Sequence, residues 1–138
     1  MSATGALVTY LRAQATVTDL LGAAGNVWHR RVPQGASYPR VMLQRIGSDA
    51  TRHLAGVSAI EQTLYEVLSL AETAAEAEAV AEAIDALLNG YRGAMGAVWV
   101  SGCGRTELRD GDVATTQGTE ERRFEVRQEY VIGWHATA

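Results

Sequence analysis

The chain has 138 residues, of which 47% are hydrophobic and 20% are charged, so it fits one folded domain (residues 1–138) and disorder is excluded as its main state. Its net charge of −4 argues against a free-standing nucleic-acid binder, and its lack of lysine excludes Schiff-base and lysine general-base chemistry. The single cysteine, Cys103, excludes an internal disulfide and a cysteine-based zinc site, and no apolar run reaches the roughly 20 residues of a membrane span.

The charges are distributed unevenly along the chain. Residues 1–60 carry six arginines against Asp19 and Asp49, a net charge of +4. Residues 61–138 carry six arginines against fourteen acidic residues, a net charge of −8. Two interpretations remain open. The two halves neutralise each other inside one fold, or a basic face of one copy meets an acidic face of the next.

The chain begins with helical patterns and then enters a sheet. Periodic apolar residues predict a helix over Thr4–Gln14. A second helical turn follows, capped at its start by Thr16 or Thr18 and ended by Gly22. Val27–Arg30 predicts a short strand, which precedes a loop that holds both prolines of the chain.

Alternating side chains predict the main strands of the sheet. The pattern covers Arg40–Ile46, Ile60–Leu70 and Glu120–Trp134, and a further strand begins at Val98. Strands and helices in this order indicate an α+β fold. We expect an antiparallel sheet of about four strands with helices packed on one face.

One long helix is predicted over Thr73–Asn89. Thr73 and Glu76 form a capping box at its start, and Gly90 stands where a left-handed residue ends a helix. A single apolar stripe is predicted to face the core. Its members are Ala77, Val80, Ala81, Ile84, Leu87 and Leu88.

The opposite face of this helix is acidic. It carries Glu78, Glu82 and Asp85, and no arginine of the same helix offsets them. Either water solvates this face, or arginines from another element or another subunit lie against it.

Two segments are predicted as loops because they are small, polar and rich in glycine. They are Gly47–Ala59, between two strands, and Arg109–Gly118. A long loop in a compact domain is usually functional or mobile. The first is therefore either a floppy hairpin tip or a segment that orders against a partner. The charged candidates in the two loops are Arg52, His53, Arg109, Asp110 and Asp112.

The residue types that could carry chemistry do not form a recognisable site. None of the three histidines, His29, His53 and His135, is followed three or four residues later by a second ligand, which argues against a metal site. Ser48, Asp49 and His53 lie close in one predicted loop, but a catalytic triad depends on a rigid scaffold and not on closeness in sequence. We expect no catalytic, cofactor-binding or metal-ligating residue, and no cofactor.

Five segments stand in a distinctive order that covers nearly the whole chain. They are Ala6–Ala13 (ALVTYLRA), Thr16–Gly22 (TVTDLLG), Val27–Pro39 (VWHRRVPQGASYP), Ala71–Gly93 (AETAAEAEAVAEAIDALLNGYRG, with Gln62 in the preceding strand) and Glu125–Trp134 (EVRQEYVIGW). In this order the chain resembles a family of bacteriophage tail-completion proteins, the tail terminators or tail-to-head joining proteins of long-tailed phages and prophages.

The resemblance implies a structural role in the virion. Such proteins form a ring, generally of six copies, at the head-proximal end of the tail tube in the neck of the virion, and are assembled in the host cytoplasm. The ring stops tube growth and contacts the tail tube protein and a head-completion or stopper protein, with no membrane involved. DNA passes through its lumen without specific binding. A ring needs two different contact patches on each subunit.

Other functions remain as alternatives. The chain could be another neck protein, such as a connector or stopper, a small hydrolase built on Ser48, Asp49 and His53, or a soluble ligand-binding domain. Under the ring reading, we expect the first loop to point toward the ring axis or a neighbouring tail component. The candidate interface residues are Arg52, His53, Glu78, Glu82, Asp85, Arg109, Asp110 and Asp112.

Overall fold

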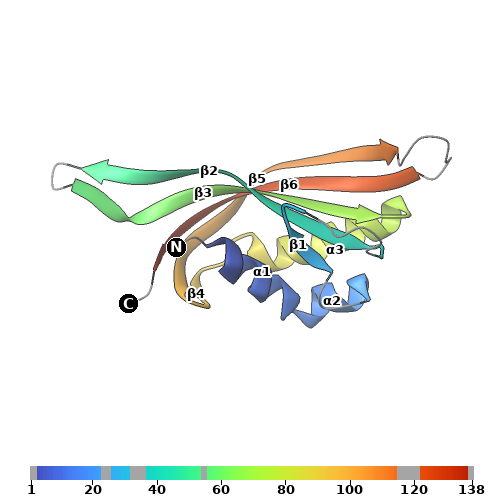
Figure 1. The fold of residues 1–138 in the computed structure, drawn as a ribbon, viewed down its shortest axis with the longest axis horizontal. Coiled ribbons are helices and arrows are strands. Elements are labelled where there is room, and N and C mark those ends of the chain that lie inside the picture. The colour runs from blue at the N-terminus through green and yellow to red at the C-terminus, as the bar shows by residue number, and fades with distance from the viewer. Residues whose placement is uncertain (1–2, 23–25, 32–36, 54–55, 115–121, 137–138) are drawn as a thin grey trace.

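The computed structural model describes residues 3–22, 26–31, 37–53, 56–114 and 122–136, with the backbone alone at 49–53, 56–59, 111–114 and 122–123. These residues form three helices and six strands (Figure 1). In chain order they are α1 (Thr4–Arg12), α2 (Ala15–Leu21), β1 (Val27–His29), β2 (Arg40–His53), β3 (Gly56–Ala71), α3 (Ala74–Leu88), β4 (Gly93–Met95), β5 (Val98–Ala114) and β6 (Arg122–Ala136).

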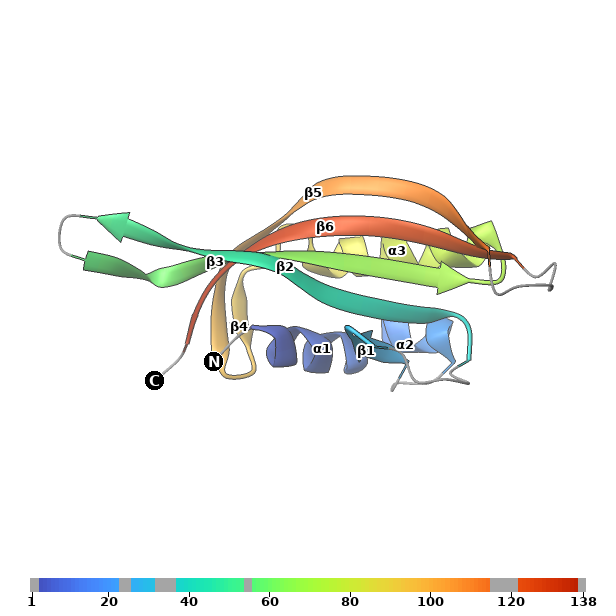
Figure 2. The same ribbon diagram turned by 45° about the horizontal axis from the view of Figure 1, so that its top comes forward.

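The strands form one curled sheet in the order β1-β2-β3-β6-β5-β4, and the helices lie against one of its faces (Figure 2). The predicted α+β class is therefore confirmed, whereas the expected number of about four strands is too low. The expectation of a purely antiparallel sheet is also wrong, because β1 runs parallel to β2. The short strand predicted over Val27–Arg30 is present as β1, whereas β4, the other edge strand, has three residues and is too short for alternation to be seen in the sequence.

The main core lies between the sheet and the helices. Alternate residues of the central strands face inward, and the helices add their apolar stripes. Cys103 of β5 is buried in this core, and burial raises the pKa of its thiol to about 12. The largest fully buried apolar side chains are Tyr65, Tyr130, Leu7, Leu11, Leu21, Leu43, Ile84, Leu88 and Ile132.

The long helix follows its sequence signals closely. The Glu76 backbone N–H donates to Thr73 Oγ1 at 3.2 Å, as the capping box predicts. Gly90 follows the helix with φ of 88°, the left-handed conformation that glycine adopts without strain. Ile84 and Leu88 are fully buried, whereas Leu87 is only half-buried at the edge of the stripe.

Substituting the capping residue tests this helix start. Thr73→Ala removes the acceptor of the Glu76 N–H and should lower the free energy of unfolding by about 1 kcal/mol. Thr73→Ser keeps a hydroxyl in place and should lose much less. Urea denaturation of the two variants checks this, and an equal loss for both would show that the hydroxyl does not act as the cap.

The start of α2 differs from the prediction. Gln14, and not a threonine, stands at its N-cap with an extended backbone, so both predicted caps are wrong. Only Ala13 and Gln14 separate α1 from α2, so the second helix has already begun when the chain reaches Thr16. Its predicted end is confirmed, because Gly22 adopts φ of 74°.

The two predicted loops are largely strand. β2 continues to His53 and β3 begins at Gly56, so most of Gly47–Ala59 belongs to an antiparallel hairpin. β5 likewise continues to Ala114, and only 115–118 of the second predicted loop lie outside the described residues. Register shifts at Arg45/Gly47, Ala50/Arg52 and Arg105/Glu107 hide these strands from alternation analysis, because each shift moves the side chains to the other face.

The outer face of the sheet carries a row of like charges. Glu66 of β3 and Glu107 of β5 both stand directly opposite Glu129 of β6. Partial burial raises the pKa of Glu129, and the carboxylates of Glu107 and Glu66 raise it further. Arg127 lies 3.7 Å from Glu66 and 3.4 Å from Glu125, so it offsets part of this negative charge.

The raised pKa of Glu129 predicts that replacing this residue with a neutral one stabilises the fold, by an amount that depends on pH. Because its pKa is higher in the folded state, its contribution to stability is fully present below the unfolded pKa and is lost as the pH rises through the folded pKa. Glu129→Gln should therefore raise the free energy of unfolding by about 0.5 kcal/mol at pH 7 and by nothing measurable near pH 3. Urea melts at the two pH values test this, and an equal gain at both would contradict it.

Candidate functional site

A groove of about 320 Å³ lies between the acidic face of α3 and strands β5 and β6. Four of the eight predicted interface residues meet there, namely Glu78, Glu82 and Asp85 from α3 and Asp110 from β5. We call this the acidic groove. Among the described residues, its lining is Glu78, Ala81, Glu82, Asp85, Ala86, Arg105, Leu108, Asp110, Val126 and Gln128.

One arginine of the same chain reaches the acidic face of α3. Arg105 of β5 lies 3.4 Å from Asp85, and the Tyr130 hydroxyl donates to the same carboxylate at 2.9 Å. Burial and the hydrogen bond to Asp85 raise the pKa of Tyr130, so this phenol stays protonated. Glu78 and Glu82 are exposed and form no ion pair with any described residue. Water therefore solvates the part of this face that holds Glu78 and Glu82, whereas an arginine from another element pairs with Asp85.

The floor of the acidic groove contains an unsatisfied acceptor. Gln128 of β6 is fully buried, and its side-chain Nε2 donates to the backbone oxygen of Ala81 at 3.1 Å. Its Oε1 accepts no hydrogen bond within the described part of the chain. Leu108 lines the same groove and is 47% exposed. The groove thus offers carboxylates and an apolar wall, with the Gln128 amide oxygen buried beneath them.

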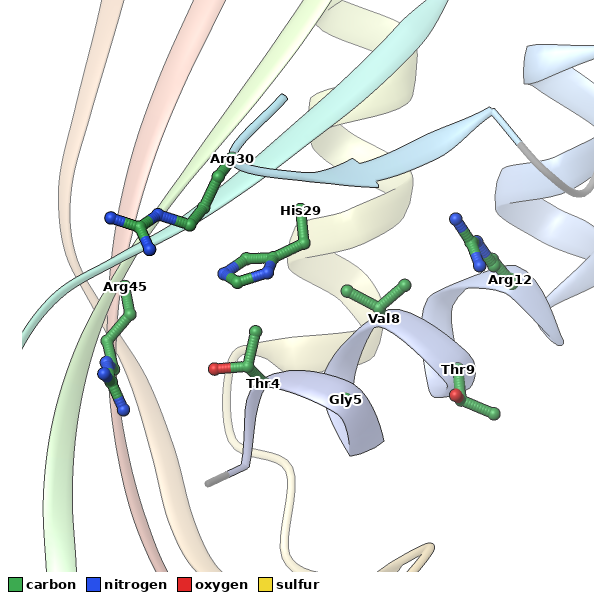
Figure 3. A pocket seen from close by; sticks show the side chains of 8 residues that line it. All are labelled: Thr4, Gly5, Val8, Thr9, Arg12, His29, Arg30 and Arg45. Carbon is green, nitrogen blue, oxygen red and sulfur yellow. The ribbon is translucent and has the colours of Figure 1, made fainter. Parts of the chain in front are cut away.

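A second, basic pocket of about 550 Å³ lies over α1, β1 and the start of β2 (Figure 3). It holds the side chains of Arg12, His29, Arg30 and Arg45, and we call it the basic pocket. Burial, together with the charges of Arg30 and Arg45, lowers the pKa of His29, so the imidazole is neutral at pH 7. The remaining lining residues are Thr4, Gly5, Val8 and Thr9.

The arginines of the basic pocket are held differently. Arg12 donates from Nε and Nη2 to the Val27 backbone oxygen at 3.0 and 2.7 Å, and its guanidinium lies 5.5 Å from the Trp28 ring centre. Arg30 and Arg45 are exposed and form no ion pair or side-chain hydrogen bond with any described residue. Sequence reasoning missed this pocket, although the net charge of +4 over residues 1–60 was a signal for it.

The structure places the other four predicted interface residues on strands β2 and β5. Arg52 and His53 belong to β2, and of their environment only the backbone is described. Arg109 forms an ion pair with Glu107 two residues earlier on β5, and Asp112 lies further along the same strand.

The hairpin of β2 and β3 projects from the body of the fold (Figure 1). Within the described residues, β6 pairs with β3 only from Glu61 onward, where Glu61 stands opposite Trp134. Residues 50–53 and 56–60 therefore form a two-stranded extension with no third strand beside it, which we call the arm. Such an isolated hairpin is marginally stable in water.

The proposed triad of the hydrolase reading is not assembled. The Ser48 hydroxyl donates to Glu61 Oε2 at 3.0 Å and is hydrogen-bonded with Thr63 at 2.9 Å. Because β2 is extended, five residues separate Ser48 from His53 by about 16 Å. Among the described residues, no group of three or more His, Cys, Asp or Glu side chains is placed to hold a metal ion, and no helix is long and apolar enough to span a membrane.

The family model described as "Tail completion protein gp17" matches residues 5–128. The chain belongs to this family of phage tail-completion proteins. The resemblance recognised in the sequence is thereby confirmed, and the tail-completion protein is a structural component of the phage virion tail. Its role therefore involves assembly with other tail and head proteins.

A structural comparison agrees on the fold of the tail-completion protein. One similar solved chain comes from a structure titled "Virion of native gene transfer agent (GTA) particle". The two chains are 20% identical with a TM-score of 0.56, and the match covers 96% of this chain and 98% of that one. A search of curated proteins by sequence found no matching relative.

Proposed function

We propose that the chain forms a ring, of six copies, at the head-proximal end of the tail tube, in the virion neck. The ring ends tube growth and joins the tail to the head, with the tail tube protein on one side and a head-completion or stopper protein on the other. The observation that carries this proposal is the family match over residues 5–128. In this role the protein performs no catalysis, binds no cofactor and assembles in the host cytoplasm.

The arrangement of charged surfaces supports a ring. The basic pocket and the acidic groove lie on different elements of one chain, as a head-to-tail contact between identical subunits requires. The arm supports it as well, because an isolated hairpin gains stability by packing against a neighbour. DNA transit through the lumen needs no tight phosphate binding, which suits a chain with a net charge of −4.

A nonsense mutation in the gene of the encoding phage or prophage tests the proposal. Without the ring, tubes should grow beyond their normal length and filled heads should remain unjoined, and a plasmid copy should restore both. Negative-stain electron microscopy of lysates measures tail length and joining. Tails of normal length beside heads that lose their DNA would instead indicate a connector or stopper.

A further inference from the structure

Most carboxylates of the acidic groove have no basic partner within the described residues. Glu78, Glu82 and Asp110 form no ion pair with any described residue, and Asp85 is held by Arg105 and by the Tyr130 hydroxyl. Buried Gln128 adds an amide oxygen that accepts no hydrogen bond. Buried acceptors without donors are rare in folded proteins. A donor from outside can reach the exposed carboxylates of Glu78, Glu82 and Asp110, whereas the Gln128 oxygen beneath them is buried.

Two arginines of the same chain lack an acidic partner, just as the acidic groove lacks a basic one. Arg30 and Arg45 stand at the basic pocket and form no ion pair with any described residue, and their side chains lie on the same side of the His29 ring (Figure 3). A guanidinium offers a planar fork of N–H donors that fits carboxylate and amide oxygens. These two side chains therefore supply the chemistry that the acidic groove lacks.

The backbone at Arg30 adopts a left-handed conformation that is strained for a residue with a side chain. Its φ is 66°, and it is the only non-glycine residue with positive φ in the described chain. The β1–β2 pairing holds this conformation, because the Arg30 backbone N–H donates to the Leu43 oxygen at 2.8 Å. Strain of this kind collects at functional positions, where the surrounding structure maintains it.

The two surfaces cannot meet inside one chain. The basic pocket is built from α1, β1 and β2, at one end of the strand order, and the acidic groove from α3, β6 and β5, toward the other end. A contact between them must join two copies, with each copy using both surfaces. Repeated head-to-tail contacts of this kind close into a ring when the rotation per subunit allows it.

We propose that the acidic groove of one copy binds Arg30 and Arg45 of the next copy, so that this charged contact is the seam between ring subunits. The proposal rests on the proposed ring and names its contact residues. Opposite charges on the two surfaces favour a second copy over DNA as the occupant of the basic pocket, because DNA would leave the acidic groove without a donor. Such a contact should weaken as salt concentration rises.

Charge reversal and its rescue test the seam. Arg30→Glu/Arg45→Glu reverses one surface, and Glu78→Arg/Glu82→Arg reverses the other. Each double variant should lower the yield of infectious particles at least tenfold when it complements the nonsense mutant. The quadruple variant carries both reversals, which restores opposite charges at every seam, so its yield should return to within about threefold of the wild type.

Matched controls show whether a loss of yield comes from the position of the reversed charges, and not from a change in net charge or from unfolding. Arg92→Glu and Glu72→Arg make the same changes at exposed residues outside both surfaces and should leave the yield unchanged. Thermal melts of the isolated variants confirm that each remains folded. Sedimentation velocity on mixtures of the two double variants should show heavier species than either alone, which tests the contact without relying on the neck role.

Three results would overturn the seam. One is wild-type yield from both double variants, and another is a quadruple variant as defective as its parents. The third is loss of yield from the Arg30/Arg45 variant alone, which would assign the basic pocket to DNA phosphates or another partner. Failure of the ring itself would be recognised separately, as normal tail length in the nonsense mutant.

Discussion

Replacing residues 51–60 with the dipeptide Asn-Gly is expected to give a folded protein that no longer ends tail growth. Infections complemented with this variant should produce overlong tails and unjoined heads. Ala50 and Glu61 are paired in the hairpin, and Asn-Gly is the preferred two-residue connection between paired strands. Every β3–β6 pair is kept, because the first of them is Glu61 with Trp134.

The arm variant loses only the part of the hairpin that lacks a third strand. Its free energy of unfolding should therefore stay close to that of the wild type, as measured by urea denaturation. Arg52→Ala/His53→Ala is the companion variant, because it keeps the arm and removes its two basic side chains. Virions of normal length from the shortened protein would refute a role for the arm and leave the family assignment unaffected.

Ile84→Ala should be the most damaging single truncation in the long helix. Ile84 is 0% exposed and packs in the main core between α3 and the sheet. Removing its buried methyl and methylene groups leaves a cavity and should cost about 2–5 kcal/mol in the free energy of unfolding. Urea denaturation followed by circular dichroism measures this loss.

Leu87→Ala is the matched control for that truncation. Leu87 lies three residues further along the helix and is half-buried, so part of its side chain already contacts water. Its loss on truncation should be clearly smaller than that of Ile84. A larger loss at Leu87 than at Ile84 would show that the helix turns a different face to the core.

The long helix could be predicted because its signals are local. Thr73 and Glu76 fix its start, a stripe of apolar residues fixes its buried face, and Gly90 fixes its end. The signals act within a few residues of each other, so the sequence alone contains them. The same stripe did not separate half-buried Leu87 from fully buried Leu88, because the edge of a buried helix face depends on what packs against it in the tertiary structure.

The extent of the strands could not be predicted, because it depends on partners far along the chain. Gly47 and Ser48 are small and polar, and they join a strand because Leu64 and Thr63 lie opposite them. The stretch around Asp110 has the composition of a turn and is strand through its pairing with β6. Bulges near these positions break the alternation that would have revealed them.

Only the part of the candidate surfaces that lies on one helix could be predicted, because contacts between distant segments decide the rest. The acidic side of the groove lies on one helix face, so helical spacing alone groups Glu78, Glu82 and Asp85. Its other wall, with Leu108 and Gln128, comes from strands whose placement against α3 is tertiary. The basic pocket combines residues from three separate elements, and no spacing rule joins those.

Cryo-electron microscopy of tails purified from infected cells is the most direct test of the proposed role. We predict a closed ring of this chain at one end of every finished tube, at the end that meets the head in joined particles. Subunits in that ring should contact each other head to tail. Finished tubes that lack this chain at the head-proximal end, or that carry it along their whole length, would contradict the proposed ring.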